Sequence, residues 1–214
     1  MKRCLHIYLI LLLGCFADVA FASEPVADSS KVKVGFAYDL NFDMQFDNRE
    51  FYKSAYTSSM TIFGTRITPS VGVALEQKNG ARHRLMVGID VLKNFGAAND
   101  NSELFKEMTL YYNVQKQLGK TGFEMVAGVF PRRFAEGSYS QAFYSDSLRF
   151  YDNNLEGLLL KFSRPRAHFE VGCDWMGRYD TYRRERFQIF SAGEGQVLPF
   201  MSIGYAASLY HFSC

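Results

Sequence analysis

The segment from residue 131 to residue 154 carries a group of charged side chains that could act on a solute, together with six aromatic residues. If it folds into the interior of a pore, its charges form a constriction that selects ions by sign, because rings of charge set pore preference. If it lies outside the pore, it is an ordinary solvated loop. The candidate constriction residues are Arg132, Arg133, Asp146, Arg149 and Asp152.

The last residues contain a histidine and a serine two positions apart, His211 and Ser213. On an extended strand this spacing places both side chains on one face. A histidine base there could activate the serine as a nucleophile, provided that a third residue orients the histidine. No third partner follows in the sequence, and two residues at this spacing often occur by chance. The sequence therefore assigns no catalytic residue.

A second cationic stretch, RYDTYRRERF, spans residues 178–187. Guanidinium groups in an exposed loop could meet the phosphates of a lipid surface. A solvated loop is the simpler interpretation of the same charges. The charged residues considered are Arg178, Arg183, Arg184, Glu185 and Arg186.

The sequence gives no motif for binding a metal ion, a phosphate group or nucleic acid. Downstream of residue 22 the cysteines are Cys173 and Cys214, without a CxxC motif or Cys/His spacing for zinc. No glycine-rich phosphate loop is present, and a net charge of +2 gives no argument for nucleic acid. We expect no metal, no cofactor and no nucleic-acid partner.

Side chains alternate between apolar and polar without interruption over residues 31–46. Period two predicts a strand with one apolar face, and at ~3.3 Å per residue this strand would reach roughly 50 Å. Eight further segments alternate in the same way, and no segment predicts an amphipathic helix. The nine predicted strands span residues 31–46, 61–75, 83–95, 104–118, 123–129, 155–162, 167–175, 185–192 and 197–212.

The connections between these strands alternate in length. Short turns are predicted at 77–81, 119–122, 164–166 and 193–196, and long loops at 47–59, 96–103, 131–154 and 178–185. Tight turns at one end and long loops at the other are typical of an up-and-down barrel in the bacterial outer membrane. The predicted fold class is therefore all-β, an antiparallel up-and-down transmembrane β-barrel over residues 31–213.

With this layout, the stretches FYDNNLEGLLLKF (150–162) and FEVGCDW (169–175) resemble Gram-negative outer-membrane β-barrel proteins of the porin-like kind. The resemblance implies an outer-membrane location, contact with outer-membrane lipid, and either passage of small solutes or a structural role in the envelope, with oligomers allowed. These stretches carry no catalytic signature, so we expect no enzyme. The His-x-Ser pair is similar to that of outer-membrane lipid hydrolases, which makes a barrel-embedded lipid hydrolase an alternative.

A secreted β-sandwich or lipocalin-like protein that binds a ligand is another alternative. In such a protein the apolar face would enclose a core and the polar face would meet water. Long strands, and a polar face rich in Gly, Thr, Asn and Gln, favour the membrane instead.

Residues 1–22 predict a secretory signal peptide. Lys2 and Arg3 precede a short apolar run, and Ala20-Phe21-Ala22 fits a cleavage site. The sequence Leu12-Leu13-Gly14-Cys15 also resembles a lipobox, which would leave Cys15 acylated. Under both interpretations the chain is exported from the cytoplasm.

The number of predicted strands indicates whether the barrel is complete. If the short turns are periplasmic, the ninth strand ends on the outer side, whereas a closed barrel of this kind has both ends inside and an even number of strands. We therefore expect a chain truncated at its C-terminus.

Overall fold

A computed structural model describes residues 32–56, 58–96, 104–141, 143–181 and 184–213. The predicted signal peptide and Cys15 lie outside these residues. Within the described ranges, no helix is long and apolar enough to cross a membrane.

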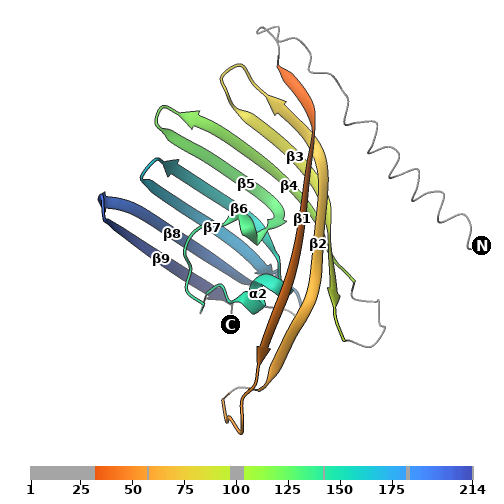
Figure 1. Cartoon of the computed structure of the whole chain (residues 1–214). Coiled ribbons are helices and arrows are strands. Elements are labelled where there is room, and N and C mark those ends of the chain that lie inside the picture. The colour runs from red at the N-terminus through yellow and green to blue at the C-terminus, as the bar shows by residue number, and fades with distance from the viewer. Residues whose placement is uncertain (1–31, 57, 97–103, 142, 182–183, 214) are drawn as a thin grey trace, which may run out of the picture. The chain divides into compact units, whose positions relative to one another are not determined.

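In the part of the chain that the structure describes, nine antiparallel strands form one sheet in sequence order, which confirms the predicted fold class and strand number (Figure 1). Each strand pairs with the one that follows it in the chain. The strands are β1 (Lys33–Arg49), β2 (Met60–Glu76), β3 (Arg82–Asn94), β4 (Phe105–Leu118), β5 (Thr121–Pro131), β6 (Asn154–Arg164), β7 (Ala167–Gly177), β8 (Arg186–Leu198) and β9 (Met201–Phe212).

The connections keep the predicted alternation of short turns and long loops. In the β2–β3 turn Gly80 has a positive φ of 77°, and the Ala81 amide donates to Asn79 Oδ1 over 3.0 Å. This is the conformation that an Asn-Gly pair adopts readily.

The predicted turn at residues 193–196 is wrong. Gly193 pairs with Tyr205 inside the ladder, so β8 continues to Leu198 and the chain reverses at Pro199 and Phe200. Glycine is tolerated within a strand, whereas proline has no amide hydrogen to donate and ends the pairing.

The two faces of the sheet separate by parity, as expected. Phe36 lies opposite Val73, Val73 opposite Leu85, and Leu85 opposite Tyr112, so one apolar row crosses four strands. These side chains are exposed, with 59% of Phe36 and 56% of Leu85 accessible. An apolar, exposed face is suited to lipid and not to water.

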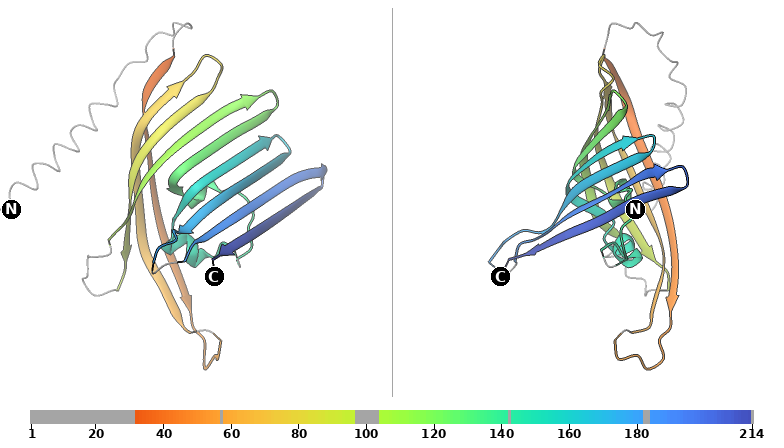
Figure 2. Two further views of the ribbon diagram at one scale, coloured as in Figure 1. Left: turned by 180° about the vertical axis from the view of Figure 1, so that it is seen from behind. Right: turned by 90° about the vertical axis from the view of Figure 1, so that its left-hand side faces the viewer.

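The opposite, concave face is covered by the segment between β5 and β6 (Figures 1 and 2). It contains the short helices η2 (Arg132–Phe134) and α2 (Asp146–Tyr151). The sequence predicted no helix here, because six residues are too few for a periodic signal. Ser145 caps α2, its side chain accepting from the Leu148 amide over 3.0 Å.

Aromatic packing fixes this segment on the sheet. Phe150 of α2 is 1% exposed and packs with Ile62 of β2 and Leu92 of β3. Further along, the ring centroids of Tyr144 and Phe190 of β8 lie 5.7 Å apart. The segment therefore touches both halves of the sheet.

The described sheet has two edges, β1 and β9, and is not closed. Eight successive antiparallel pairings make these edge strands run in the same direction. The expectation of a truncated barrel is not tested by this arrangement and stays a prediction.

The exposed apolar face generates a prediction about membrane stability. Val87 lies between Val71 and Leu110 in the middle of this face. We expect Val87→Arg to lower the free energy of unfolding in lipid vesicles by about 2–4 kcal/mol, because an arginine at mid-depth must be desolvated. Urea titration of the full chain measures this.

Leu118→Arg is the matched control, since Leu118 has the same orientation but is the last residue of β4. Near an interface the cost falls to about 0–1 kcal/mol. Equal losses for both variants would contradict a lipid-facing surface.

Candidate functional site

Arg132 is the central cation of the concave face and is only 3% exposed. Its Nη1 donates to Asp174 Oδ2 over 2.7 Å, and its Nη2 donates to Asp152 Oδ2 over 2.8 Å. Its Nε donates to the Asp152 carbonyl over 2.6 Å. The guanidinium thus ties η2 to β7 and to the end of the long segment.

The other candidate constriction residues are spread out. Arg133 forms an ion pair with Asp39 of β1. The Arg149 guanidinium lies 5.6 Å from the centre of the Tyr144 ring, and Asp146 accepts weakly from Gln141 at 3.4 Å. The structure joins Arg132 to Asp152 and joins neither of them to Asp146. A constriction that selects solutes stays a prediction.

Glu170 of β7 is a second anchor for the segment and is 1% exposed. Its Oε1 accepts from the Gly137 amide over 2.9 Å and from the Tyr139 hydroxyl over 2.5 Å. Its Oε2 accepts from the Glu136 amide over 3.0 Å. Burial, together with the bond to Glu170, raises the pKa of Tyr139, and burial raises the pKa of Tyr144 to about 12.

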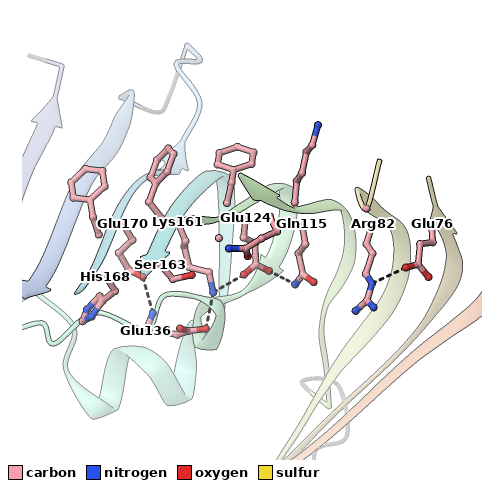
Figure 3. A pocket seen from close by; sticks show the side chains of 16 residues that line it. Glu76, Arg82, Gln115, Glu124, Glu136, Lys161, Ser163, His168 and Glu170 are labelled. Carbon is pink, nitrogen blue, oxygen red and sulfur yellow. Dashed lines mark hydrogen bonds and ion pairs between the residues drawn. The ribbon is translucent and has the colours of Figure 1, made fainter. Parts of the chain in front are cut away.

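A polar cleft of about 510 Å³ opens beside this anchor, towards the short turns (Figure 3). Lys161 Nζ lies at its centre, 2.9 Å from Glu124 Oε2 and 2.7 Å from Glu136 Oε1. Glu124 Oε1 also accepts from Gln115 over 3.0 Å. Lys161 is thus paired with two carboxylates, which is typical of a structural network.

A third buried pair lies under α2. Arg66 and Asp90 are each 1% exposed, and Arg66 Nε lies 3.3 Å from Asp90 Oδ1. Asn154 Nδ2 donates to Asp90 Oδ2 over 3.1 Å and to Glu107 Oε2 over 2.8 Å. Among the residues that the structure describes, no group of three or more His, Cys, Asp or Glu side chains could hold a metal ion.

No sequence signal identifies Glu170, Asp174, Arg66 or Asp90 as a site residue. Each has the parity of the concave face, where polar residues are ordinary. A charged residue on this parity gives no sign of its burial, because the covering segment folds back from elsewhere in the chain.

His211 and Ser213 lie on the opposite, convex parity. Gln188 faces the concave side and is paired with Tyr210, so His211 points outward with its partner Phe187. The His211 ring stacks on Phe187, with centroids 4.6 Å apart and an interplanar angle of 19°.

Ser213 directly follows β9, and its amide donates to the Glu185 carbonyl over 3.0 Å. Its Oγ is buried and has no hydrogen-bond partner among the described residues. A serine hydroxyl free of other bonds, on the same outward parity as a histidine, is the candidate nucleophilic pair.

Comparison with known families gives a match to the model described as lipid A 3′-O-deacylase-type, over residues 27–200. The match covers β1 to β8 and the long segment between β5 and β6, and it ends before His211. No curated protein and no solved structure matches the chain.

This match corrects the expectation of a non-enzymatic barrel. A deacylase family is a family of hydrolases, so the prediction that the chain is not an enzyme is wrong. The lipid hydrolase alternative is closer to this family than the porin-like expectation is. The period-two pattern of the strands predicts which face contacts lipid, but it carries no information about catalysis.

The buried Arg132 pair generates a stability prediction. We expect Arg132→Met to lower the free energy of unfolding by about 3–5 kcal/mol, because Asp174 would remain buried without its cation. Chemical unfolding of the full chain in detergent measures this.

Arg49→Met is the matched control, because Arg49 is paired with Asp47 at 2.6 Å on the exposed surface. We expect its unfolding midpoint to equal that of the wild type, since exposed pairs contribute little. A similar midpoint for Arg132→Met would show that the buried pair does not stabilise the segment.

Proposed function

We propose, from the premise that this chain belongs to the lipid A 3′-O-deacylase-type family, that it hydrolyses an ester-linked acyl chain of lipid A in the outer membrane. The observation that carries the proposal at the level of residues is the shared parity of His211 and Ser213, together with a Ser213 Oγ that makes no other hydrogen bond among the described residues. The matched residues end at 200, so the roles of these two side chains rest on geometry alone.

The orientation of the pair suits a lipid substrate. The acyl chains of a membrane lipid lie against the convex face, and a nucleophile must be on that face to reach their ester bonds. Trp175, Phe187 and His211 form a continuous row of rings beside Ser213. This row supplies an apolar surface for an acyl chain.

The proposed reaction uses the serine as a nucleophile. Ser213 Oγ attacks the ester carbonyl while His211 takes its proton, and His211 then gives this proton to the departing sugar oxygen. Water, deprotonated by the same imidazole, releases the fatty acid from the serine. In this structure no hydrogen bond joins the two side chains. A rotation of the side chains that brings an imidazole nitrogen within ~3 Å of Oγ would complete the pair.

Passage of solutes has less support. The segment between β5 and β6 covers the concave face with buried rings, among them Tyr144 and Phe150, each 2% exposed or less. Side chains packed in this way leave less room for a solute path than the loop of an open pore does.

The test is release of fatty acid from lipid A by the full chain in mixed detergent micelles, followed by mass spectrometry. We expect Ser213→Ala and His211→Ala each to lower the rate by at least ~10³-fold, because the residues of a nucleophilic pair act as a unit.

Ser202→Ala is the control, because Ser202 is on the same strand with the opposite parity and is exposed. It should keep the wild-type rate. A wild-type chain that releases no fatty acid would refute the hydrolase proposal. A fully active Ser213→Ala variant would place the nucleophile elsewhere.

A further inference from the structure

A serine, a histidine and a glutamate lie in one row across three neighbouring strands of the concave face. Ser163 of β6 is paired in the ladder with His168 of β7, and His168 is paired in turn with Glu194 of β8. Lys161 and Glu170, two residues away on β6 and β7, have the same parity and line the cleft. Residues directly opposed on one face of an antiparallel pair have Cβ atoms about 4.5–5.5 Å apart. We refer to these three residues as the Ser–His–Glu row.

Two cavities meet at this row. Ser163 and His168 line the polar cleft of about 510 Å³, at the end away from Arg82 (Figure 3). His168 and Glu194 line a second cavity of about 260 Å³. The imidazole therefore lies between the two cavities, and a small molecule in the larger one can reach Ser163.

Glycines border the row on both sides. Gly122 of β5 is paired with Ser163, and a side chain at position 122 would place its Cβ 2.6 Å from Ser163 Oγ. Gly204 of β9 is paired with Glu194 on the other side. Because neither neighbour has a side chain, the serine hydroxyl and the glutamate carboxylate have room to move.

The structural network of the cleft does not use these three side chains. Within the described ranges, none of them forms a hydrogen bond or an ion pair. Their neighbours are paired, since Lys161 contacts Glu124 and Glu136, and Glu170 accepts from the covering segment. The row is therefore available to a ligand while the charges around it stabilise the fold.

We propose that the Ser–His–Glu row is a second hydrolytic site, which acts on small polar carboxylic esters. Ser163 is the nucleophile, His168 is the base, and Glu194 orients the imidazole. The cleft has the volume of a small-molecule site. It is lined mainly by charged and amide side chains, so a polar ester fits it better than a fatty acyl chain does.

The reaction proceeds through an acyl-serine. Ser163 Oγ attacks the ester carbonyl carbon while His168 takes the hydroxyl proton. The bond from this carbon to the alcohol oxygen then breaks, and His168 returns the proton to the departing alkoxide. Water attacks the acyl-serine with the same base, which releases the carboxylic acid and restores the serine.

Lys161 supplies positive charge beside the nucleophile. Its ammonium has three N–H groups, of which two meet Glu124 and Glu136. The third can donate to the carbonyl oxygen as negative charge develops there. In this structure no hydrogen bond joins the row, and rotation of the side chains that brings an imidazole nitrogen within ~3 Å of Ser163 Oγ would complete it.

The row is separate from the outward pair of the proposed deacylase. His168 is the second residue of β7, at the short-turn end, whereas His211 lies near the far end of β9 on the opposite face. The cationic stretch of residues 178–187 is at the long-loop end. Arg183 lies outside the described residues, and contact of this stretch with lipid phosphate stays a prediction. The two sites therefore receive their substrates from different sides of the sheet.

The experiment labels the full chain in detergent micelles with a fluorophosphonate, which bonds to an activated serine as fluoride leaves. The chain carries Ser213→Ala, so that no adduct forms at the outward serine. We expect mass spectrometry of the digested chain to find the adduct on Ser163. The same chain should hydrolyse 4-nitrophenyl acetate, and 4-nitrophenyl palmitate at least ~10-fold more slowly, because a polar pocket discriminates against the long acyl chain.

Variants of the row test each role. Ser163→Ala and His168→Ala should each lower acetate ester hydrolysis by at least ~10²-fold, the usual contribution of a general base. Added imidazole should restore part of the rate to His168→Ala and none to Ser163→Ala. Glu194→Gln should lower kcat at unchanged KM, and Glu194→Asp should recover most of it, as expected of a positioning residue.

Ser202→Ala is the matched control, because Ser202 is on the concave parity at the same end of the sheet but is paired with Gln196. It should keep both the adduct on Ser163 and the wild-type rate. A chain that unfolds at the wild-type midpoint but forms no adduct on Ser163 would overturn the inference, as would an adduct that persists in His168→Ala. Equal turnover of both esters would overturn the choice of a polar substrate.

Discussion

The unbroken antiparallel ladder is the constraint on which the rest of this structure depends. Lipid offers no hydrogen-bond partners, so a chain that stands in a membrane must pair its backbone groups within its own sheet. Each of the nine strands pairs with its neighbour in sequence. Side chains at even and odd positions of a strand therefore lie on opposite faces of the sheet. Close backbone approach is part of this ladder. Gly128 has a φ of 119°, and a side chain there would collide with the Leu110 carbonyl of the adjacent strand. Because side chains alternate along these paired strands, the sheet has one side that faces lipid and one side that is covered.

On the covered side, buried charges connect the wall to the segment between β5 and β6. A guanidinium or carboxylate removed from water is costly unless it is paired and hydrogen-bonded. Arg132 meets this condition only when η2 lies against β7, and Glu170 meets it only when Gly137 and Tyr139 lie above it. The same segment contributes α2, whose Phe150 fills the space between β2 and β3. Apolar packing and charge pairing thus favour one position of the segment.

The two sides therefore have different roles. The buried charges of the concave network are paired and hydrogen-bonded and stabilise the fold, whereas the convex face near β7, β8 and β9 carries the stacked rings of Trp175, Phe187 and His211. A hydrolase whose substrate is itself a membrane lipid needs its reactive groups on the outer surface. The same alternation places His211 on the outward-facing parity, opposite Phe187. The chain belongs to the lipid A 3′-O-deacylase-type family, whose match covers residues 27–200.

The sequence by itself determined the strands, their order and the face that each side chain takes, because period-two alternation and turn residues are local properties. It placed β1 to β7 within a few residues and failed at the β8–β9 turn, where glycines within a strand look like a turn. It also identified His211 and Ser213 as a possible nucleophilic pair, but their spacing alone did not distinguish the pair from a chance occurrence. Only the tertiary structure decided where the long segment lies and which charges are buried. The partners Arg132 and Asp174 are 42 residues apart, and no local pattern joins them. Burial depends on which distant segment covers a residue, and that is settled when the whole sheet has formed.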